Sequence, residues 1–309
     1  MLSAFEQEKI RRFVYRNARP LDLYRWQYHF EGGTPEQVIK VLAAYQNPDG
    51  GFGHALEADA WNPHSSPIQT STAVNILWEV GFSDGQHPLV QGILRYLDSG
   101  ADFEDGRWRN SVPTNNDFPH APWWHTDSNS TSRSDFNPTA ILVGFLLYFA
   151  PRDSALFEKG KAIAQELSAS FLKAPEIFMH PLMCVDDLCG WIEKAGLLDV
   201  FPLAKMQAQV ARQAARLIEM DRDNWSGYAC RPSHFIHSPG HPLYGLLREL
   251  TKREHKWLCD TRNDQGVWDL TWKWSGYEKE FAISENWWKA DIILRNMRFL
   301  KAFGCLETV

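Results

Sequence analysis

The chain has 309 residues, of which 44% are hydrophobic, enough apolar volume for one large domain or two small ones. Its formal net charge is -6 without any lysine or arginine block, which excludes a nucleic-acid partner because nothing would neutralise the phosphates. The first residues lack the apolar core of a signal peptide, and the longest apolar run, at 140–150, is too short to span a bilayer. We therefore expect a cytoplasmic protein without a transmembrane segment, with a peripheral membrane contact left open.

Cysteine and tryptophan usage narrows the class further. The five cysteines are odd in number and form no CxxC pair, which indicates reduced thiols and again a cytoplasmic location. The 14 tryptophans are unusual, because large flat side chains suit a lined cavity as well as a filled core.

Apolar residues recur at helical spacing from the N-terminus onward. In the segment 34–45, Thr34 is a candidate cap, Pro35 suits the first turn and Gln37 can close a capping box. Further helices are expected in the N-terminal segment and at 68–80, 87–100, 137–151, 154–172, 181–195, 203–220, 242–258 and 285–303. Because alternating strand patterns are scarce, the sequence predicts an all-α fold.

Similar short motifs separate several of these helices: DGGF at 49–52, DGRW at 105–108, DNW at 223–225 and DQGVW at 264–268. In such a motif the glycine permits a tight turn with positive φ, and the aromatic residue can wedge between helix ends. The pattern predicts an irregular repeat of helix pairs, with Phe52, Trp108 and Trp268 at comparable junctions.

The longest segment without helical periodicity runs from 102 to 136. It is polar, broken by prolines and aromatic in its middle, where Trp123 and Trp124 stand together. Loops of this length in compact domains usually cover a site, so we expect a covering loop here.

The stretch LAAYQNPDGGF, Leu42–Phe52, resembles the QW motif of squalene-hopene and oxidosqualene cyclases. The longer stretch DGGFGHALEADAWNPHSSPIQTSTAVNIL is similar to a repeat of protein prenyltransferase β-subunits, and a degenerate copy at 256–268 has Arg262 in place of the Gln. The resemblance implies the α/α toroid that both families share, here as a single domain over 1–309 with a central cavity.

The catalytic motifs of the related enzymes are missing. The cyclases use an acidic DxDD motif to start cationic cyclisation, and diphosphate-ionising terpene synthases hold magnesium with DDxxD. The nearest stretch, MCVDDLCGW, supplies only Asp186 and Asp187. The resemblance therefore implies a fold and leaves the reaction open.

The resemblance implies a possible zinc site, but the residues match the ligand pattern of the family only in part. The stretch VDDLCGWIEKAGLL looks like the zinc-bearing helix of prenyltransferase β-subunits, which would make Asp187, Cys189 and the later His241 the ligands. However, Asp186 rather than Asp187 matches the Val-Asp of the family, and His241 precedes a helix-opening proline. We therefore expect no cofactor and less than stoichiometric zinc.

Candidate site residues follow the glycine turn directly. Glu57 and Asp59 are predicted as an acid and base pair at the mouth of the toroid, with helix capping and solvation as the alternative. His54 and Trp61 flank them as substrate-binding candidates, and we expect one of the two acids to face the cavity.

The covering loop supplies the second candidate set. Trp123, Trp124, His125 and Asp127 are predicted to line a cavity, to stabilise a cation through ring faces or to stack on sugar rings. The alternative is that the two indoles only anchor the loop.

These observations predict an enzyme-like toroid that acts on an isoprenoid or other bulky apolar substrate, with Glu57 or Asp59 as proton donor and Trp61, Trp123 and Trp124 as walls. One alternative is a carbohydrate-active α/α barrel, which two carboxylates across a polar cavity would favour. The other is a non-catalytic binding or scaffold toroid, which a filled channel would favour. The partner is expected to be a small apolar or glycan ligand, and the oligomeric state stays open.

Overall fold

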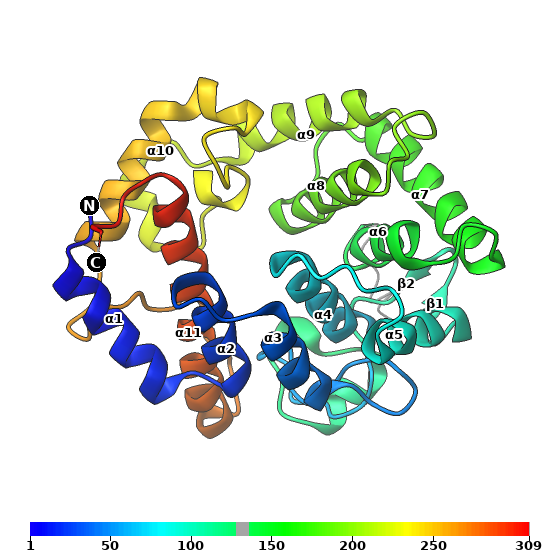
Figure 1. Cartoon of the computed structure of the whole chain (residues 1–309), viewed down its shortest axis with the longest axis horizontal. Helices are drawn as coiled ribbons and strands as arrows, with labels where there is room; N and C mark the ends of the chain where they lie inside the picture. Colours follow the sequence, from blue (N-terminus) through cyan, green and yellow to red (C-terminus); the bar gives the residue numbers. More distant parts are fainter. Residues whose placement is uncertain (128–135, 309) are drawn as a thin grey trace. The chain divides into compact units, whose positions relative to one another are not determined.

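The computed structural model describes residues 1–127 and 136–308, and in these ranges the chain is mostly helical, as the sequence predicts (Figure 1). The described α-helices are α1 (Ala4–Asn17), α2 (Pro20–Phe30), α3 (Pro35–Leu42), α4 (Pro67–Glu79), α5 (Pro88–Ser99), α6 (Thr139–Phe149), α7 (Ala155–Lys173), α8 (Met179–Lys194), α9 (Leu203–Leu217), α10 (Pro242–Asp260) and α11 (Glu278–Ala302). Among them, none combines the length and the apolar character that a bilayer crossing requires.

Short elements connect the helices. Five 3-10 helices are described: η1 (Ala43–Tyr45), η2 (Pro113–Asp117), η3 (Pro122–Trp124), η4 (Arg222–Ser226) and η5 (Pro232–His234). The described sheet is a single antiparallel hairpin of two residues per strand, β1 (Phe103–Glu104) and β2 (Arg107–Trp108). The all-α prediction is therefore confirmed for the described ranges.

The chain groups into two compact units. The terminal unit consists of Met1–Val41 with Ala214–Val309, and the middle unit of Leu42–Gln213. The single toroidal domain stays a prediction.

Histidine caps explain where two helices begin. At the start of α5, His87 accepts a hydrogen bond from the Leu89 N–H at 3.2 Å. At the start of α10, His241 accepts one from the Leu243 N–H at 3.3 Å. In each case a proline occupies the first helical position, where its missing N–H costs nothing. His241 therefore has a local structural role.

In the middle unit, α6 packs against α4 and α8 in one row, and α5 and α7 lie against it (Figure 1). Every residue of α6 except Tyr148 is buried, as its unbroken apolar sequence predicts. Gly144 lets α8 approach, since a Cβ there would lie 2.5 Å from Cδ1 of Trp191. The row thus depends on a small residue opposite a large indole.

In the terminal unit, α1, α2 and α11 pack on one another around a buried ion network. Nη1 of Arg25 lies 2.9 Å from Asp22 Oδ1 and 3.0 Å from Asp291 Oδ1. Removing one member would leave a buried charge, so the network holds α2 against α11.

The segment predicted as a covering loop is more ordered than expected where it is described. Residues 103–108 form the hairpin, with Asp105 and Gly106 in the left-handed region at φ 49° and 79°. Residues 113–124 contain η2 and η3, and 128–135 lie outside the described residues. The described part is a folded excursion rather than an irregular loop.

The predicted aromatic wedges are buried. Phe52 and Trp108 are fully buried and Trp268 is 4% exposed. The N–H of Phe52 donates to Oγ1 of Thr70 in α4 at 3.1 Å, and the N–H of Trp108 donates to Oγ1 of Thr139 in α6 at 2.9 Å. In the middle unit, a threonine hydroxyl of α4 or α6 therefore accepts a hydrogen bond from the backbone of each wedge residue.

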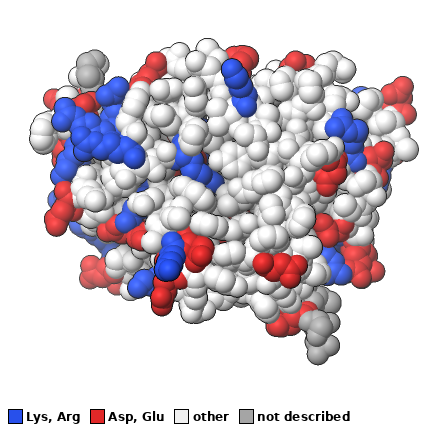
Figure 2. All heavy atoms as spheres, turned by 90° about the horizontal axis from the view of Figure 1, so that it is seen from below, with Lys and Arg blue, Asp and Glu red and all other residues white. Residues whose placement is uncertain are grey.

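Figure 2 shows one face of the molecule, on which acidic and basic side chains are intermixed and separated by uncharged surface. Opposite charges this close together cancel at a distance. On this face the net charge of -6 is not gathered into one strongly acidic patch.

Candidate functional site

The glycine turn that opens the candidate site is a closed loop. The N–H of Asn47 donates to the Gly51 carbonyl at 2.8 Å, and the N–H of Gly50 donates to the Asn47 carbonyl at 2.9 Å. Gly50 has φ 95°, which only glycine adopts without strain. The predicted tight turn is confirmed.

The turn is pressed against α5. A Cβ on Gly50 would lie 2.0 Å from the carbonyl oxygen of Gly92, and a Cβ on Gly92 would lie 2.4 Å from Nε2 of Gln46. That Nε2 donates to the carbonyls of Gly50 and Leu89, both at 2.9 Å. Gln46 therefore links the turn to the first turn of α5, with a glycine on each side of the contact.

The degenerate copy in the terminal unit folds into the same loop. The N–H of Asn263 donates to the Val267 carbonyl at 2.8 Å, the N–H of Gly266 donates to the Asn263 carbonyl at 2.8 Å, and Gly266 has φ 82°. Trp268 Nε1 donates to the Leu258 carbonyl at 3.0 Å. Two stretches far apart in sequence thus share one backbone geometry, which supports the predicted repeat.

The segment after the turn, which carries the candidate acids Glu57 and Asp59, is buried and folded. His54 and Ala55 both adopt positive φ, at 59° and 57°, and the chain then turns inward. Glu57 is 9% exposed and Asp59 3% exposed, so neither carboxylate points into bulk water. The Oε1 of Gln69 in α4 accepts the Leu56 N–H at 2.9 Å and fixes the segment on the helix start.

The two predicted residue sets lie on neighbouring segments. The N–H of Trp61 donates to the Pro119 carbonyl at 2.9 Å, and the N–H of Ala121 donates to the Asp59 carbonyl at 2.8 Å. These bonds place the acids beside the segment that continues into η3.

Within that segment, the two indoles differ from the alternative in which both only anchor the loop, and the cavity-lining role stays a prediction. Trp123 is 47% exposed, whereas Trp124 is half-buried. His125 stacks on His120 with ring centroids 5.4 Å apart, and its Nε2 lies 3.5 Å from Asp127 Oδ1. This leaves one tryptophan face available to a ligand.

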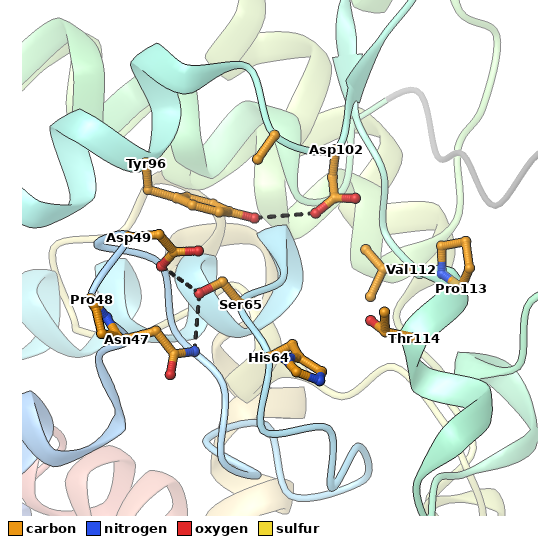
Figure 3. Close-up of a pocket in the computed structure, with 11 residues that line it drawn as sticks. Asn47, Pro48, Asp49, His64, Ser65, Tyr96, Asp102, Val112, Pro113 and Thr114 are labelled. Carbon is orange, nitrogen blue, oxygen red and sulfur yellow. Dashed lines mark hydrogen bonds between the residues drawn. The ribbon is translucent and has the colours of Figure 1, made fainter.

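A pocket of about 670 Å³ lies on the other side of the glycine turn (Figure 3). The described residues that line it are Asn47, Pro48, Asp49, His64, Ser65, Tyr96, Ala101, Asp102, Val112, Pro113 and Thr114. All belong to the middle unit, and none is among the residues predicted from the sequence. The glycine turn, which the sequence predicts as a structural element between helices, therefore also lines the pocket through Asn47, Pro48 and Asp49.

Polar groups converge in this pocket. Ser65 Oγ donates to Asp49 Oδ1 at 2.7 Å and accepts from Asn47 Nδ2 at 3.0 Å. The same Asp49 oxygen accepts the N–H of Gly51 at 2.9 Å, so this carboxylate is fixed by the turn. Figure 3 shows Tyr96 directed at Asp102, with Oη 3.5 Å from Oδ2.

The two carboxyl groups of the pocket sit in different environments. Burial raises the pKa of Asp102, and the like charge of Asp49 adds to the rise, while Arg109 and the Tyr96 hydroxyl oppose it. Burial also raises the pKa of Tyr96, followed by the charges of Asp102 and Asp49, so its hydroxyl stays a donor. The carboxylate of Asp49 instead accepts two hydrogen bonds, one from the Gly51 N–H and one from the Ser65 hydroxyl. The pocket therefore pairs an acid whose pKa is raised by burial with a second carboxylate that accepts two hydrogen bonds.

The sequence contained a partial signal for these residues. Asp49 belongs to the turn motif, where an aspartate before glycine is common for structural reasons alone. Asp102 adopts φ 54°, and aspartate is one of the few residues that tolerates this region. Tyr96 reads as part of an amphipathic helix, so its role could not be recognised without the fold.

The described residues include no group of three metal-ligating side chains. Cys189 and Asp187 are two apart on α8, a spacing that puts them on different faces. Burial raises the pKa of the Cys189 thiol, followed by the charges of Asp186 and Asp187, which opposes the thiolate that zinc needs. Desolvation also raises the pKa of Asp186 to about 6 and of Asp187 to about 7, and both side chains are half-buried.

Comparison of the chain with models of protein families, with curated proteins and with solved structures finds no match. The residues and their geometry therefore carry the functional argument.

Proposed function

We propose that the chain is an α/α toroid, like the terpenoid cyclases and prenyltransferase β-subunits it resembles, and that it acts on a polyhydroxylated ligand of the glycan class. The row of α4, α6 and α8 with α5 and α7 against it supports the toroid, as does the loop that recurs at 47–52 and 263–268. The observation that carries the function is the pair Asp49 and Asp102 on one polar pocket.

The chemistry that fits this pair is hydrolysis of a glycosidic bond. Protonated Asp102 donates its proton to the bridging oxygen as the bond from that oxygen to the anomeric carbon breaks. A water adds its oxygen to the anomeric carbon, and the proton it loses goes to Asp49. Hydrogen bonds from the Gly51 N–H and the Ser65 hydroxyl hold the Asp49 carboxylate in position to accept this proton.

The remaining lining suits the same ligand class. Asn47, His64 and Thr114 bring amide, imidazole and hydroxyl groups to the pocket, and the backbone of Pro48 and Pro113 stiffens its edges. A ligand rich in hydroxyls can exchange hydrogen bonds with these groups, whereas an isoprenoid chain would leave them unpaired. The isoprenoid substrate, and Glu57 or Asp59 as its proton donor, stay predictions that would require a separate apolar cavity.

The test uses two amide substitutions that preserve local structure. Asp102→Asn is compatible with the left-handed backbone at this position, and Asp49→Asn keeps an oxygen that can accept from Gly51 and Ser65. A panel of oligosaccharides with chromogenic leaving groups is screened with the unmodified protein across pH. Each variant is expected to lower turnover at least about a hundredfold, in the range of general acid–base contributions.

The matched control is Asp105→Asn, which changes an exposed aspartate at φ 49° in the nearby hairpin. It is expected to leave turnover unchanged. The pH profile separates the two roles, because loss of the acid removes the alkaline limb and loss of the base removes the acidic limb. If the protein binds glycans without turning them over, the hydrolytic mechanism is wrong and the non-catalytic binding function is favoured. If it turns over prenyl compounds and both the Asp49→Asn and the Asp102→Asn variant keep that activity, the proposal is refuted.

A further inference from the structure

The C-terminal ends of α4, α6 and α8 carry a second arrangement that the pocket does not use. Trp78, Tyr148 and Trp191, one from each helix, surround the ammonium group of Lys194. Its Nζ lies 4.9 Å from the ring centroid of Trp78, 4.8 Å from that of Tyr148 and 5.4 Å from that of Trp191. All three distances fall within the range of a cation–π interaction.

The rings form a corner rather than a flat stack. The planes of Trp78 and Trp191 meet at 62° with centroids 4.6 Å apart, and those of Tyr148 and Trp191 meet at 47° with centroids 5.5 Å apart. Walls inclined in this way present several ring faces to one point between them. The three rings therefore lie around one point, which the ammonium group of Lys194 occupies.

The walls are held in place by the packing of the row. Trp191 is 1% exposed and stands against Gly144, and Trp78 packs over Gly190, where an added Cβ would lie 3.2 Å from its ring. Trp78 itself is 38% exposed, so one wall of the site opens to solvent. A buried back wall with an open front wall is suited to a ligand that enters from outside.

Lys194 differs from the lysines of the chain that form ion pairs. Lys161, Lys252 and Lys289 each pair with a carboxylate. In the described parts of the chain, Lys194 forms no ion pair or hydrogen bond, and its recorded contacts are the three rings. Desolvation lowers the pKa of Lys194, as expected where the rings displace part of the water around the ammonium group.

We propose that Trp78, Tyr148 and Trp191 form an aromatic cage for a methylated ammonium group of the choline class, and that Lys194 occupies this cage as an internal competitor. A quaternary ammonium keeps the attraction to the ring faces and is easier to dehydrate than a primary ammonium. Such a ligand therefore gains more from the cage than the lysine does. Lys194 lies in the last turn of α8 and is exposed, so its side chain can leave without disturbing the helix.

The experiment compares two probes of nearly the same shape, choline and its neutral isostere 3,3-dimethylbutan-1-ol. Each is titrated into the full chain while the indole N–H signals of Trp78 and Trp191 are followed by NMR. Lys194→Ala is expected to bind choline at least about tenfold more tightly than the unmodified protein does, because the competitor is gone. The same variant is expected to prefer choline over the neutral isostere by a similar factor.

Two controls separate the cage from other effects. Lys173→Ala removes a lysine from the last turn of α7 and should leave choline binding as in the unmodified protein. Trp78→Ala combined with Lys194→Ala should abolish the choline preference. Lys194→Gln serves in place of Lys194→Ala if the latter melts early. Equal binding of the two probes, or no saturable choline binding by either Lys194 variant, would refute the proposal and leave Lys194 as a structural contact.

Discussion

Replacing Gly50 by alanine tests the contact between the glycine turn and α5. An alanine at φ 95° costs about 1 to 2 kcal/mol for the backbone conformation alone. Its Cβ would also meet the Gly92 carbonyl oxygen at 2.0 Å and the carbonyl carbon at 2.5 Å. Because both atoms are backbone, neither can rotate away, and the turn must separate from α5.

The separation breaks the link that Gln46 makes. Its Nε2 donates to the carbonyls of Gly50 and Leu89, and each lost hydrogen bond costs about 0.5 to 1.5 kcal/mol. Together with the backbone cost, the substitution is expected to lower the free energy of unfolding by about 2 to 5 kcal/mol. This is a large share of the stability of an ordinary domain.

Gly81→Ala is the matched control, because Gly81 also has positive φ, at 66°, and a Cβ there would meet no atom within 4 Å. This variant should lose only the backbone term of about 1 to 2 kcal/mol. Both free energies are measured by urea unfolding of the full chain, with tryptophan fluorescence and circular dichroism followed together. Equal losses in the two variants would refute the role of the contact with α5.

Further predictions concern burial, titration and metal. Phe52→Ala is expected to lower the unfolding free energy by about 3 to 5 kcal/mol, and Phe178→Ala, at an 85% exposed site, by less than about 0.5 kcal/mol, as measured by urea unfolding. The raised pKa of Asp102 means that the folded state binds its proton more tightly, so stability falls as pH rises from the unfolded pKa through the folded one; Asp102→Asn should remove this fall, which melting curves across pH will check. The raised pKa values of Asp186 and Asp187, about 6 and about 7, predict a further fall in stability between pH 4 and 7 that the double asparagine variant should flatten. Elemental analysis of protein purified without added zinc should find less than one equivalent, and a full equivalent would support the prenyltransferase-like ligand set.

The helices were predictable because their signals are local. Proline at the first position, a capping side chain before it and a left-handed glycine after it mark α5 from the sequence alone, and Gly100 indeed has φ 74°. The start of α11 was not predictable, since Glu278–Ala302 begins seven residues before the window at 285–303. Its first turn follows Tyr277 in the left-handed region, without a side-chain cap.

The pocket was not predictable because it depends on distant segments meeting. Asp49 lies in the turn, whereas Asp102 and Thr114 come from the excursion that the sequence presented only as polar and aromatic. Residues chosen for their chemistry alone, such as Glu57 and Asp59, proved to be buried in a folded segment. A sequence motif shows which residues can do chemistry, and tertiary structure decides which of them share a cavity.

The two copies of the loop separate structural positions from chemical ones. Asparagine at the first position, Asn47 or Asn263, and glycine at the fourth make the same backbone hydrogen bonds in both copies, so these residue types follow from the turn. At the third position the copies differ, with Asp49 in one and Gln265 in the other, and the backbone geometry is the same. The loop therefore does not require a carboxylate there. The presence of Asp49 is better explained by the pocket that it lines, and this is why we propose Asp49 and Asp102 as the reactive pair.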